Sequence, residues 1–193
     1  MSQLEDLTER SQCVHHASCI ILSDEFGRRR RDAWKLYPVQ GQGTREALLL
    51  TVDVHNHFIP MDVVDGARKG SAFDGLTVEM VDGQEWLVHR QGYRYPLHRG
   101  FYDVDERLRS MDAQGIDEAV VSISPTLFMY WTEASAAADF CQRTNDALAA
   151  FAASSGGRLH SVATLPMQDP DLAAAELRRA VVKLGLRGAQ IGP

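Results

Sequence analysis

The sequence predicts an α/β fold in which parallel strands alternate with helices. Two observations support this prediction. Short apolar runs, as at residues 119–121 and 188–191, alternate with longer segments whose apolar residues recur at helical spacing. The connections between these segments are short, and strand–helix units joined in this way form parallel sheets with right-handed crossovers.

Composition narrows the class of protein. The chain has 193 residues, of which 45% are hydrophobic and 24% charged, as in an ordinary globular protein. Its net charge of −6 gives no general attraction for nucleic acid or an anionic membrane surface. No apolar run approaches the roughly 20 residues of a membrane span. Three scattered cysteines favour a reducing compartment, so a cytoplasmic location is expected.

Residues 1–46 differ from the rest and are expected to form an irregular leader. Four consecutive arginines at 28–31 are interpreted as a solvated patch. The leader also holds four candidate zinc ligands: Cys13, His15, His16 and Cys19. No second pair follows at zinc-finger spacing, which favours the irregular leader. One hypothesis is that the leader is an upstream extension, because the strand that begins near Ala47 resembles the first element of a domain.

The most informative segment is the strand that follows the leader, where an apolar run leads into two histidines separated by one residue. Side chains alternate along a strand. The apolar residues are expected on one buried face: Leu48, Leu50, Val52 and Val54. Asp53, His55 and His57 then share the other face. Two imidazoles at the end of a strand can bind one metal ion, and Asp53 can hydrogen-bond a ligand or contact the metal. The alternative is a pair of surface histidines in a loop.

Residues 72–99 are expected to form a β insertion. Strands at 77–81 and 86–89 flank an Asp-Gly turn, which is typical of a hairpin. A short third strand is expected at 93–96.

Three helices and three further strands complete the alternation. Asp103 and Glu106 are placed to cap the first of these helices, and Gly115 closes it. Asp169 and Pro170 open the last helix. In chain order the expected elements are helix 103–115, strand 116–124, helix 133–154, strand 159–165, helix 169–185 and strand 188–191.

Four parallel strands with a histidine pair at the end of the first fit a TIM-like (β/α) barrel, whose active sites lie at the C-terminal ends of its strands. A full barrel has about 250 residues and eight strands. Residues 47–193 are therefore expected to form the N-terminal half of such a barrel, with the insertion at 72–99.

Several motifs together resemble the amidohydrolase superfamily. The segment DVHNHF at 53–58 is similar to the strand-one motif of that superfamily. Six further motifs resemble its amidohydrolase-related branch, which contains aminocarboxymuconate-semialdehyde and γ-resorcylate decarboxylases. They lie at residues 111–117, 122–125, 128–131, 145–148, 164–170 and 184–192. The resemblance covers about residues 50–193.

The resemblance implies a TIM barrel with one catalytic divalent metal, usually zinc and sometimes manganese, whose first two ligands are His55 and His57. It also implies that the further ligands, a histidine and an aspartate, and the catalytic histidine follow later barrel strands. Those strands lie beyond the four predicted here, so the catalytic residues of this chain are unknown. Catalytic zinc sites normally have three protein ligands.

The resemblance also suggests residues that contact a small carboxylated substrate. Relatives offer an arginine from the insertion to the substrate carboxylate, and Arg94 and Arg99 are the candidates, since a guanidinium binds a carboxylate bidentately. Phe128 and Trp131 follow the second barrel strand and are candidates for walling an aromatic or dienoic substrate. Solvated charge is the alternative for the arginines, and packing against a helix is the alternative for the aromatic residues.

Three functional hypotheses remain. The first is a metal-dependent lyase of the decarboxylase branch, which removes carbon dioxide from a carboxylated semialdehyde or aromatic acid. The second is a metal-dependent hydrolase of the same family. The third is a catalytically incompetent truncated fragment, since a half-barrel leaves its edge strands unpaired. Association of two halves into a homodimer is also considered and ranked behind truncation.

Overall fold

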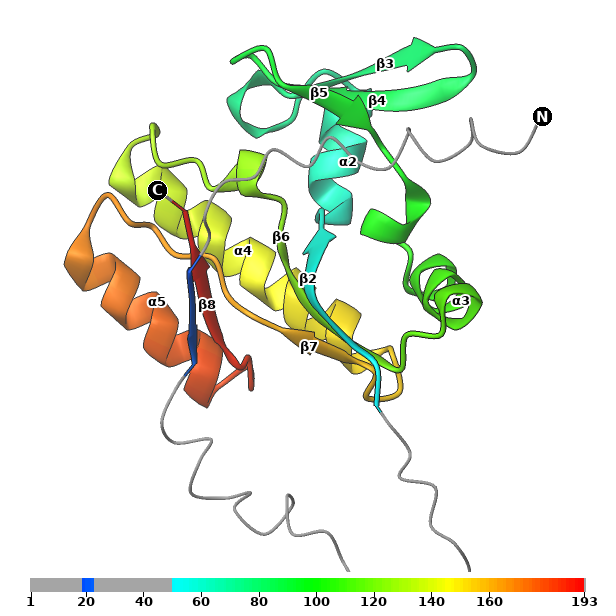
Figure 1. Ribbon diagram of the computed structural model, residues 1–193. Helices are drawn as coiled ribbons and strands as arrows, with labels where there is room; N and C mark the ends of the chain where they lie inside the picture. Colours follow the sequence, from blue (N-terminus) through cyan, green and yellow to red (C-terminus); the bar gives the residue numbers. More distant parts are fainter. Residues whose placement is uncertain (1–18, 23–49, 193) are drawn as a thin grey trace, which may run out of the picture.

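The computed structural model describes residues 19–22 and 50–192 (Figure 1). The predicted zinc ligands before residue 19, the arginines at 28–31 and the start of the first barrel strand at 47–49 lie outside these residues. In chain order the elements are β1 (Cys19–Leu22), β2 (Val52–Phe58), α2 (Met61–Arg68), β3 (Thr77–Val81), β4 (Gln84–Val88), β5 (Arg94–Pro96), α3 (Val104–Gln114), β6 (Glu118–Ile123), α4 (Ala134–Ala153), β7 (Leu159–Ser161), α5 (Pro170–Val182) and β8 (Gly188–Ile191).

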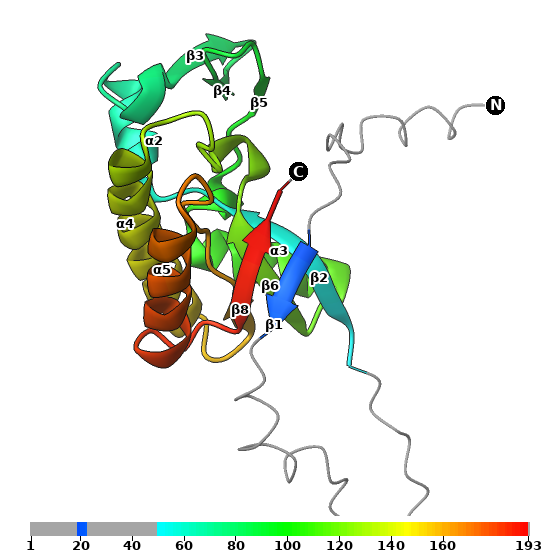
Figure 2. The same cartoon turned by 90° about the vertical axis from the view of Figure 1, so that its left-hand side faces the viewer.

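A parallel sheet lies at the centre of the described structure. Strands β2, β6 and β7 are neighbours in that order, and both pairings are parallel. A parallel bridge between Ala163 and Ala189 places β8 next to the segment that follows β7. Helices α4 and α5 lie side by side along one side of these strands (Figure 2). The alternation of parallel strands and helices that the sequence predicts is confirmed.

The helix ends follow from their capping residues. The Asp103 carboxylate accepts the Glu106 amide at 3.1 Å, and Gly115 ends α3 with a φ of 66°. A side chain at that φ is disfavoured, which is why glycine serves there. Asp169 accepts the amides of Asp171 and Leu172 at the start of α5. These caps set the lengths of α3 and α5 close to the predicted ones.

Two hydrophobic clusters hold the elements together. The first joins α3, α4 and α5 to the sheet and includes Val121, Leu148 and Ala189, none of which is exposed. The second, which includes Leu87 and Phe140, joins the β insertion and α2 to the first turns of α4. The insertion of β3, β4 and β5 is thus fixed to the partial barrel by apolar packing.

Helix α2 was not predicted from the sequence. It has eight residues, with Gly66 in its interior, and is too short to display a clear helical repeat. Tertiary packing stabilises it, because Val63, Val64 and Ala67 are buried in the second cluster.

The prediction that the apolar residues of the first barrel strand are buried is wrong within the described structure. Leu50 is 56% exposed, Val52 41% and Val54 63%. Among the described strands β2 pairs only with β6, so it is an edge strand. A register shift between Asp53 and Asn56 also interrupts the strict alternation of its side chains.

The leader also departs from its prediction at one place. Residues Cys19–Leu22 form β1, which pairs antiparallel with β8, so these four residues are not irregular. The reason is geometric, since β8 has an edge that can accept a strand. In the described part of the chain, no helix combines the length and the apolar character that crossing a membrane requires.

Candidate functional site

The histidine pair lies on one face of β2, near the C-terminal end of the strand. The ring centroids of His55 and His57 are 4.7 Å apart, with an interplanar angle of 82°. The two rings therefore lie on the same side of the strand, although its register shifts between Asp53 and Asn56, a stretch that includes His55. Neighbouring imidazoles of this kind can bind one ion together.

The surroundings of His57 suit a neutral ligand. Burial, and next the nearby His55, lower the pKa of His57 from 6.5 to about 4, against an opposing backbone hydrogen bond from Ile123. The hydroxyl of Ser122 on β6 lies 3.3 Å from Nδ1 of His57 and also donates to the Asn56 carbonyl. Nε2 of His57 is buried and has no hydrogen-bond partner. An unpaired buried nitrogen is costly, so this atom is a candidate for contact with a ligand.

Asp53 organises the backbone of the pair rather than an imidazole ring. Its carboxylate accepts the His55 amide at 3.0 Å and the Asn56 side-chain amide at 2.7 Å. Asn56 in turn accepts the His57 amide through Oδ1 at 2.9 Å. These bonds span the register shift of β2 and fix the backbone on which the two imidazoles stand.

Helix α3 contributes a buried arginine to the same segment. Arg107 is 9% exposed and donates to the Gly100 carbonyl at 2.9 Å, to the His57 carbonyl at 2.5 Å and to the side-chain oxygen of Asn56. Burial lowers the pKa of Arg107 to about 10, and the Asp53 charge opposes this shift, so the guanidinium is charged at neutral pH.

The two arginine candidates lie on the last strand of the insertion and at its C-terminal end. Arg94 on β5 is exposed, with its guanidinium 5.1 Å from the centroid of the Trp86 ring. Arg99 pairs with Asp103 at 2.6 Å, and its side chain is 67% exposed. Both positions suit solvated charge, and neither side chain has a hydrogen bond to the histidine pair among those described.

The two aromatic candidates have different environments. Phe128 is buried and stacks on Tyr130, with ring centroids 5.3 Å apart. A Cβ on Gly192 would lie only 2.7 Å from the Phe128 ring, so this aromatic pair packs tightly against the chain just after β8. Trp131 is 49% exposed and donates to Asp74 at 2.8 Å.

The other described histidines have partners away from the pair. His89 is buried 3.4 Å from the Tyr95 hydroxyl, and His160 lies 2.6 Å from the Glu118 carboxylate at the opposite end of the sheet. His98 is exposed beside Phe101. Within residues 50–192 no group of three or more histidine, cysteine or acidic side chains is arranged to hold a metal ion.

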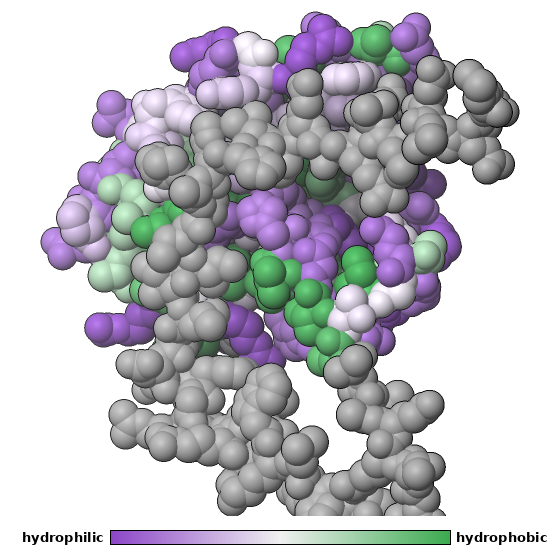
Figure 3. All heavy atoms as spheres, in the orientation of Figure 1, coloured by the Kyte–Doolittle hydropathy of each residue, from purple (hydrophilic) through white to green (hydrophobic). Residues whose placement is uncertain are grey.

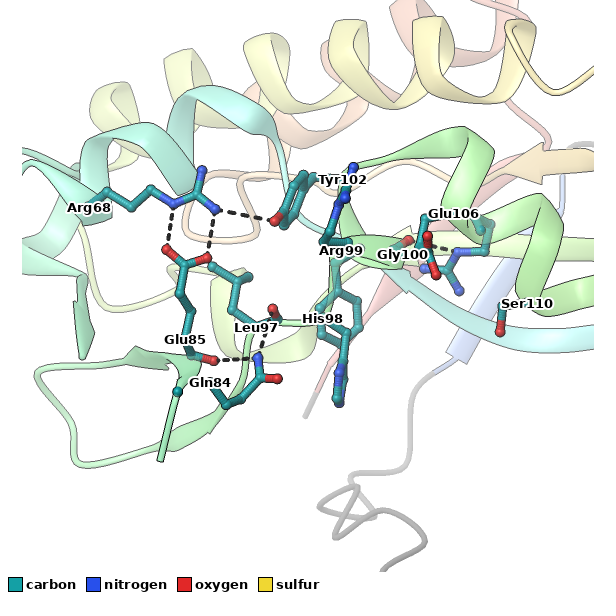
Figure 4. Close-up of a pocket in the computed structure, with 13 residues that line it drawn as sticks. Arg68, Gln84, Glu85, Leu97, His98, Arg99, Gly100, Tyr102, Glu106 and Ser110 are labelled. Atoms are coloured by element: carbon teal, nitrogen blue, oxygen red, sulfur yellow. Dashed lines mark hydrogen bonds and ion pairs between the residues drawn. The ribbon is translucent and has the colours of Figure 1, made fainter. Parts of the chain in front are cut away.

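A cleft of about 830 Å³ lies between the insertion and α3, and Arg107 is one of the residues that line it. Figure 4 shows Arg68 and Glu85 pointing toward one another at one end, and Glu106 and Ser110 at the other. The Arg68–Glu85 pair is bidentate, with distances of 2.8 and 2.7 Å, and it also contacts the Tyr102 hydroxyl. Its charges are therefore largely matched within the cleft wall.

Sequence reasoning missed Arg107, Asn56 and Ser122. A signal for Arg107 was present, because residues three and four apart on a helix are neighbours, and Arg107 shares the buried side of α3 with Met111. An arginine on an apolar stripe implies buried acceptors. What those acceptors are depends on β2, which is about fifty residues earlier in the chain.

Comparison with known proteins gives a consistent result. The amidohydrolase family profile matches residues 52–193. A curated 2-amino-3-carboxymuconate-6-semialdehyde decarboxylase from Dictyostelium discoideum is 27% identical over 152 residues, which cover 74% of this chain and 40% of the relative. A γ-resorcylate decarboxylase from Rhodococcus jostii is 40% identical over 87 residues, which cover 45% of this chain and 26% of the relative. The chain thus spans well under half the length of these relatives.

Solved structures support the partial barrel. A 5-carboxyvanillate decarboxylase from Novosphingobium aromaticivorans, solved with manganese and 3-methoxy-4-hydroxy-5-nitrobenzoic acid, matches with a TM-score of 0.55 and 25% identity, covering 75% of this chain and 42% of the other. A Metarhizium anisopliae protein called IDCase matches in fold, with a TM-score of 0.59 and 21% identity over 72% of this chain and 41% of the other.

Proposed function

We propose that this chain, which belongs to the amidohydrolase family, supplies His55 and His57 as two ligands of a divalent metal centre that serves decarboxylation of a small carboxylated acid. In this proposal residues 47–193 are the N-terminal half of the barrel, with the insertion at 72–99, and residues 1–46 are a leader. The proposed cell compartment is the cytoplasm.

The observation that carries the proposal is the state of His57. Its Nε2 is buried without a hydrogen-bond partner. Burial lowers the pKa of the imidazole to about 4, so the ring is neutral at pH 7. A metal ligand must be an unprotonated nitrogen with a free lone pair. On the other ring nitrogen, the Ser122 hydroxyl takes the place of the carboxylate, carbonyl or water that usually orients a ligating histidine.

The donor set fits a divalent ion in part. We propose zinc as the first choice, because two imidazoles suit it. Manganese is the alternative, because the 5-carboxyvanillate decarboxylase structure contains that ion. A bound divalent ion would supply Lewis-acid chemistry at this site. The residues of this chain would hold the ion, with Asp53 fixing the backbone between the two ligands.

The relatives favour decarboxylation over hydrolysis. The curated relatives named above are decarboxylases of carboxylated semialdehydes or hydroxybenzoates, and the manganese-bound structure is also a decarboxylase. We therefore propose a small carboxylated aromatic or semialdehyde substrate. Hydrolysis by an enzyme of the same family is the alternative. The third hypothesis, a catalytically incompetent fragment, predicts no turnover of any of these acids.

The proposed substrate contacts are ranked by their surroundings. Arg94 and Trp131 expose much of their side chains and keep a capacity to meet a ligand. Arg99 is paired with Asp103, and Phe128 is buried against Tyr130, so solvated charge and packing are well supported for these two. All four remain candidates for substrate binding in this proposal.

The test is metal binding by the purified chain. Zinc and manganese are titrated separately, and the bound ion is quantified after desalting. We expect about one zinc ion per chain, and loss of binding in the double variant His55→Ala, His57→Ala. The control is His98→Ala, which removes an exposed histidine elsewhere. Equal binding by the double variant would refute the site.

Turnover is measured separately on the zinc- and manganese-loaded chain. Release of carbon dioxide from 2,6-dihydroxybenzoate or a carboxylated semialdehyde supports the decarboxylase hypothesis. Metal binding without turnover of either acid supports the fragment hypothesis and leaves the ligand assignment intact.

A further inference from the structure

Arg107 connects a helix outside the sheet to the segment that bears both histidines. It reaches from α3 to the His57 carbonyl at 2.5 Å and to Oδ1 of Asn56, and its Nε donates to the Gly100 carbonyl at 2.9 Å. These three acceptors use the fork of donors that only a guanidinium offers. Its position is therefore fixed by acceptors from two separate stretches of chain, residues 56–57 and Gly100.

Arg107 forms hydrogen bonds directly to a proposed metal ligand and to the residue beside it. The carbonyl of His57 belongs to a proposed ligand, and Asn56 separates the two ligands. Asn56 also donates to Asp53, whose carboxylate accepts the His55 amide. Through these bonds the guanidinium restrains the backbone of both histidines.

We propose that Arg107 is a positioning residue for the metal site, which sets the relative orientation of His55 and His57 by holding the His57 carbonyl and the Asn56 side chain. This inference rests on the proposed metal centre. Arg107 itself does not contact the ion. Outer contacts of this kind usually change metal affinity by about 10–100-fold.

A second arginine provides a matched control for a purely structural role. Arg158 also donates to two backbone carbonyls, those of Asp117 and Ile116, and to the Asp112 carboxylate at 2.5 Å. These contacts lie at the C-terminal end of α3 and in the turn before β6, at the end of the sheet away from the C-terminal ends of the strands. Loss of Arg158 thus removes comparable hydrogen bonds without touching the histidine segment.

The cleft beside Arg107 makes chemical rescue possible. Arg107 and Ser110 line this cleft of about 830 Å³, which is large enough for a small guanidinium ion. Truncation to alanine leaves space that methylguanidinium can enter from the cleft.

The experiment measures Co²⁺ binding by visible absorption and by competition with a chelator, on the full chain. The variants are Arg107→Ala, Arg107→Lys and Arg158→Ala, and folding is checked by circular dichroism and thermal unfolding. We expect both Arg107 variants to bind Co²⁺ about 10–100-fold more weakly. Arg158→Ala should stay within about twofold of the original chain. Methylguanidinium should restore Arg107→Ala and leave the original chain unchanged. If Arg107→Ala does not fold, Arg107→Lys retains the charge but not the fork.

Each other outcome overturns a defined statement. Unchanged Co²⁺ affinity in a folded Arg107 variant refutes the positioning role. Equal weakening by Arg158→Ala shows that general destabilisation explains the effect, and also refutes it. Absence of Co²⁺ binding in the original chain, or binding that survives loss of both histidines, refutes the metal centre itself and the positioning role with it.

Discussion

The hydroxyl of Ser122 lies between two polar groups of the histidine strand, 3.3 Å from Nδ1 of His57 and 3.3 Å from the Asn56 carbonyl. Because the single hydroxyl hydrogen is donated to the Asn56 carbonyl, the contact with His57 is best made by an Nδ1–H that donates to the serine oxygen. That tautomer leaves the lone pair on Nε2, the atom that the proposed metal needs.

Replacing this serine tests the tautomer. Ser122→Ala should weaken zinc binding by about 10-fold, because Nδ1 of His57 loses the partner that orients the ring. Competition with a chromophoric zinc chelator measures the affinity. The control is Ser124→Ala, which removes a buried hydroxyl that contacts Tyr95 and Thr126 instead. A similar loss in the control would argue against the tautomer.

His89 should make the stability of the fold depend on pH. Burial lowers the pKa of His89 from 6.5 to about 4, while the Asp74 charge opposes the shift. The unfolded chain therefore binds a proton between pH 6.5 and 4 that the folded chain does not, and stability falls as the pH drops through this window. At about 1.4 kcal/mol per pKa unit, the loss attributable to His89 at pH 4 is about 3 kcal/mol.

Urea unfolding of the original chain and of His89→Gln, at pH 7 and pH 4, measures this effect. The variant should lose less stability between the two pH values, whatever its absolute stability. Equal losses in the two proteins would show that His89 does not contribute.

A buried amide should stabilise the contact between α4 and the strand end after β7. Asn145 is not exposed; it donates to the Thr164 carbonyl, accepts the Thr164 amide at 2.9 Å, and donates to Glu176 at 2.7 Å. Asn145→Ala leaves these buried groups without partners, so we expect the free energy of unfolding to fall by about 3 kcal/mol. Urea denaturation checks this, with Gln114→Ala on the surface of α3 expected to change little.

The edge of β2 should promote self-association. Figure 3 shows apolar side chains gathered below the centre of the face of the molecule that is in view. The exposed large apolar residues of β2 and of the segment just before it are Leu50, Val52 and Val54. Unpaired edge strands with exposed apolar residues pair with other chains. Val52→Lys should therefore reduce the apparent mass in light scattering at high protein concentration.

The control for this prediction is Met80→Lys on β3, which changes an apolar residue within the insertion that is even more exposed than Val52. If Val52→Lys leaves the mass unchanged, or if both variants lower it equally, the edge of β2 is not the surface of association.

Local signals predicted much of the fold. The caps at Asp103 and Asp169 and the glycine at 115 define where α3 and α5 begin or end, since each satisfies backbone groups within a few residues. The hairpin of β3 and β4 follows equally from its Asp-Gly turn. Helix α2 was missed because its stability comes from contacts with the insertion rather than from its own sequence.

For the candidate site, too, some features were predictable from local sequence and others depend on tertiary contacts. The sequence by itself determined that His55 and His57 stand on one face of a strand, because a two-residue spacing and the strand period are both local. Only the tertiary structure decided that the ring of His57 is buried beside Ser122 and that Arg107 holds its carbonyl. Those contacts join residues about fifty to sixty-five positions apart, and only the parallel pairing of β2 with β6 and the packing of α3 bring them together.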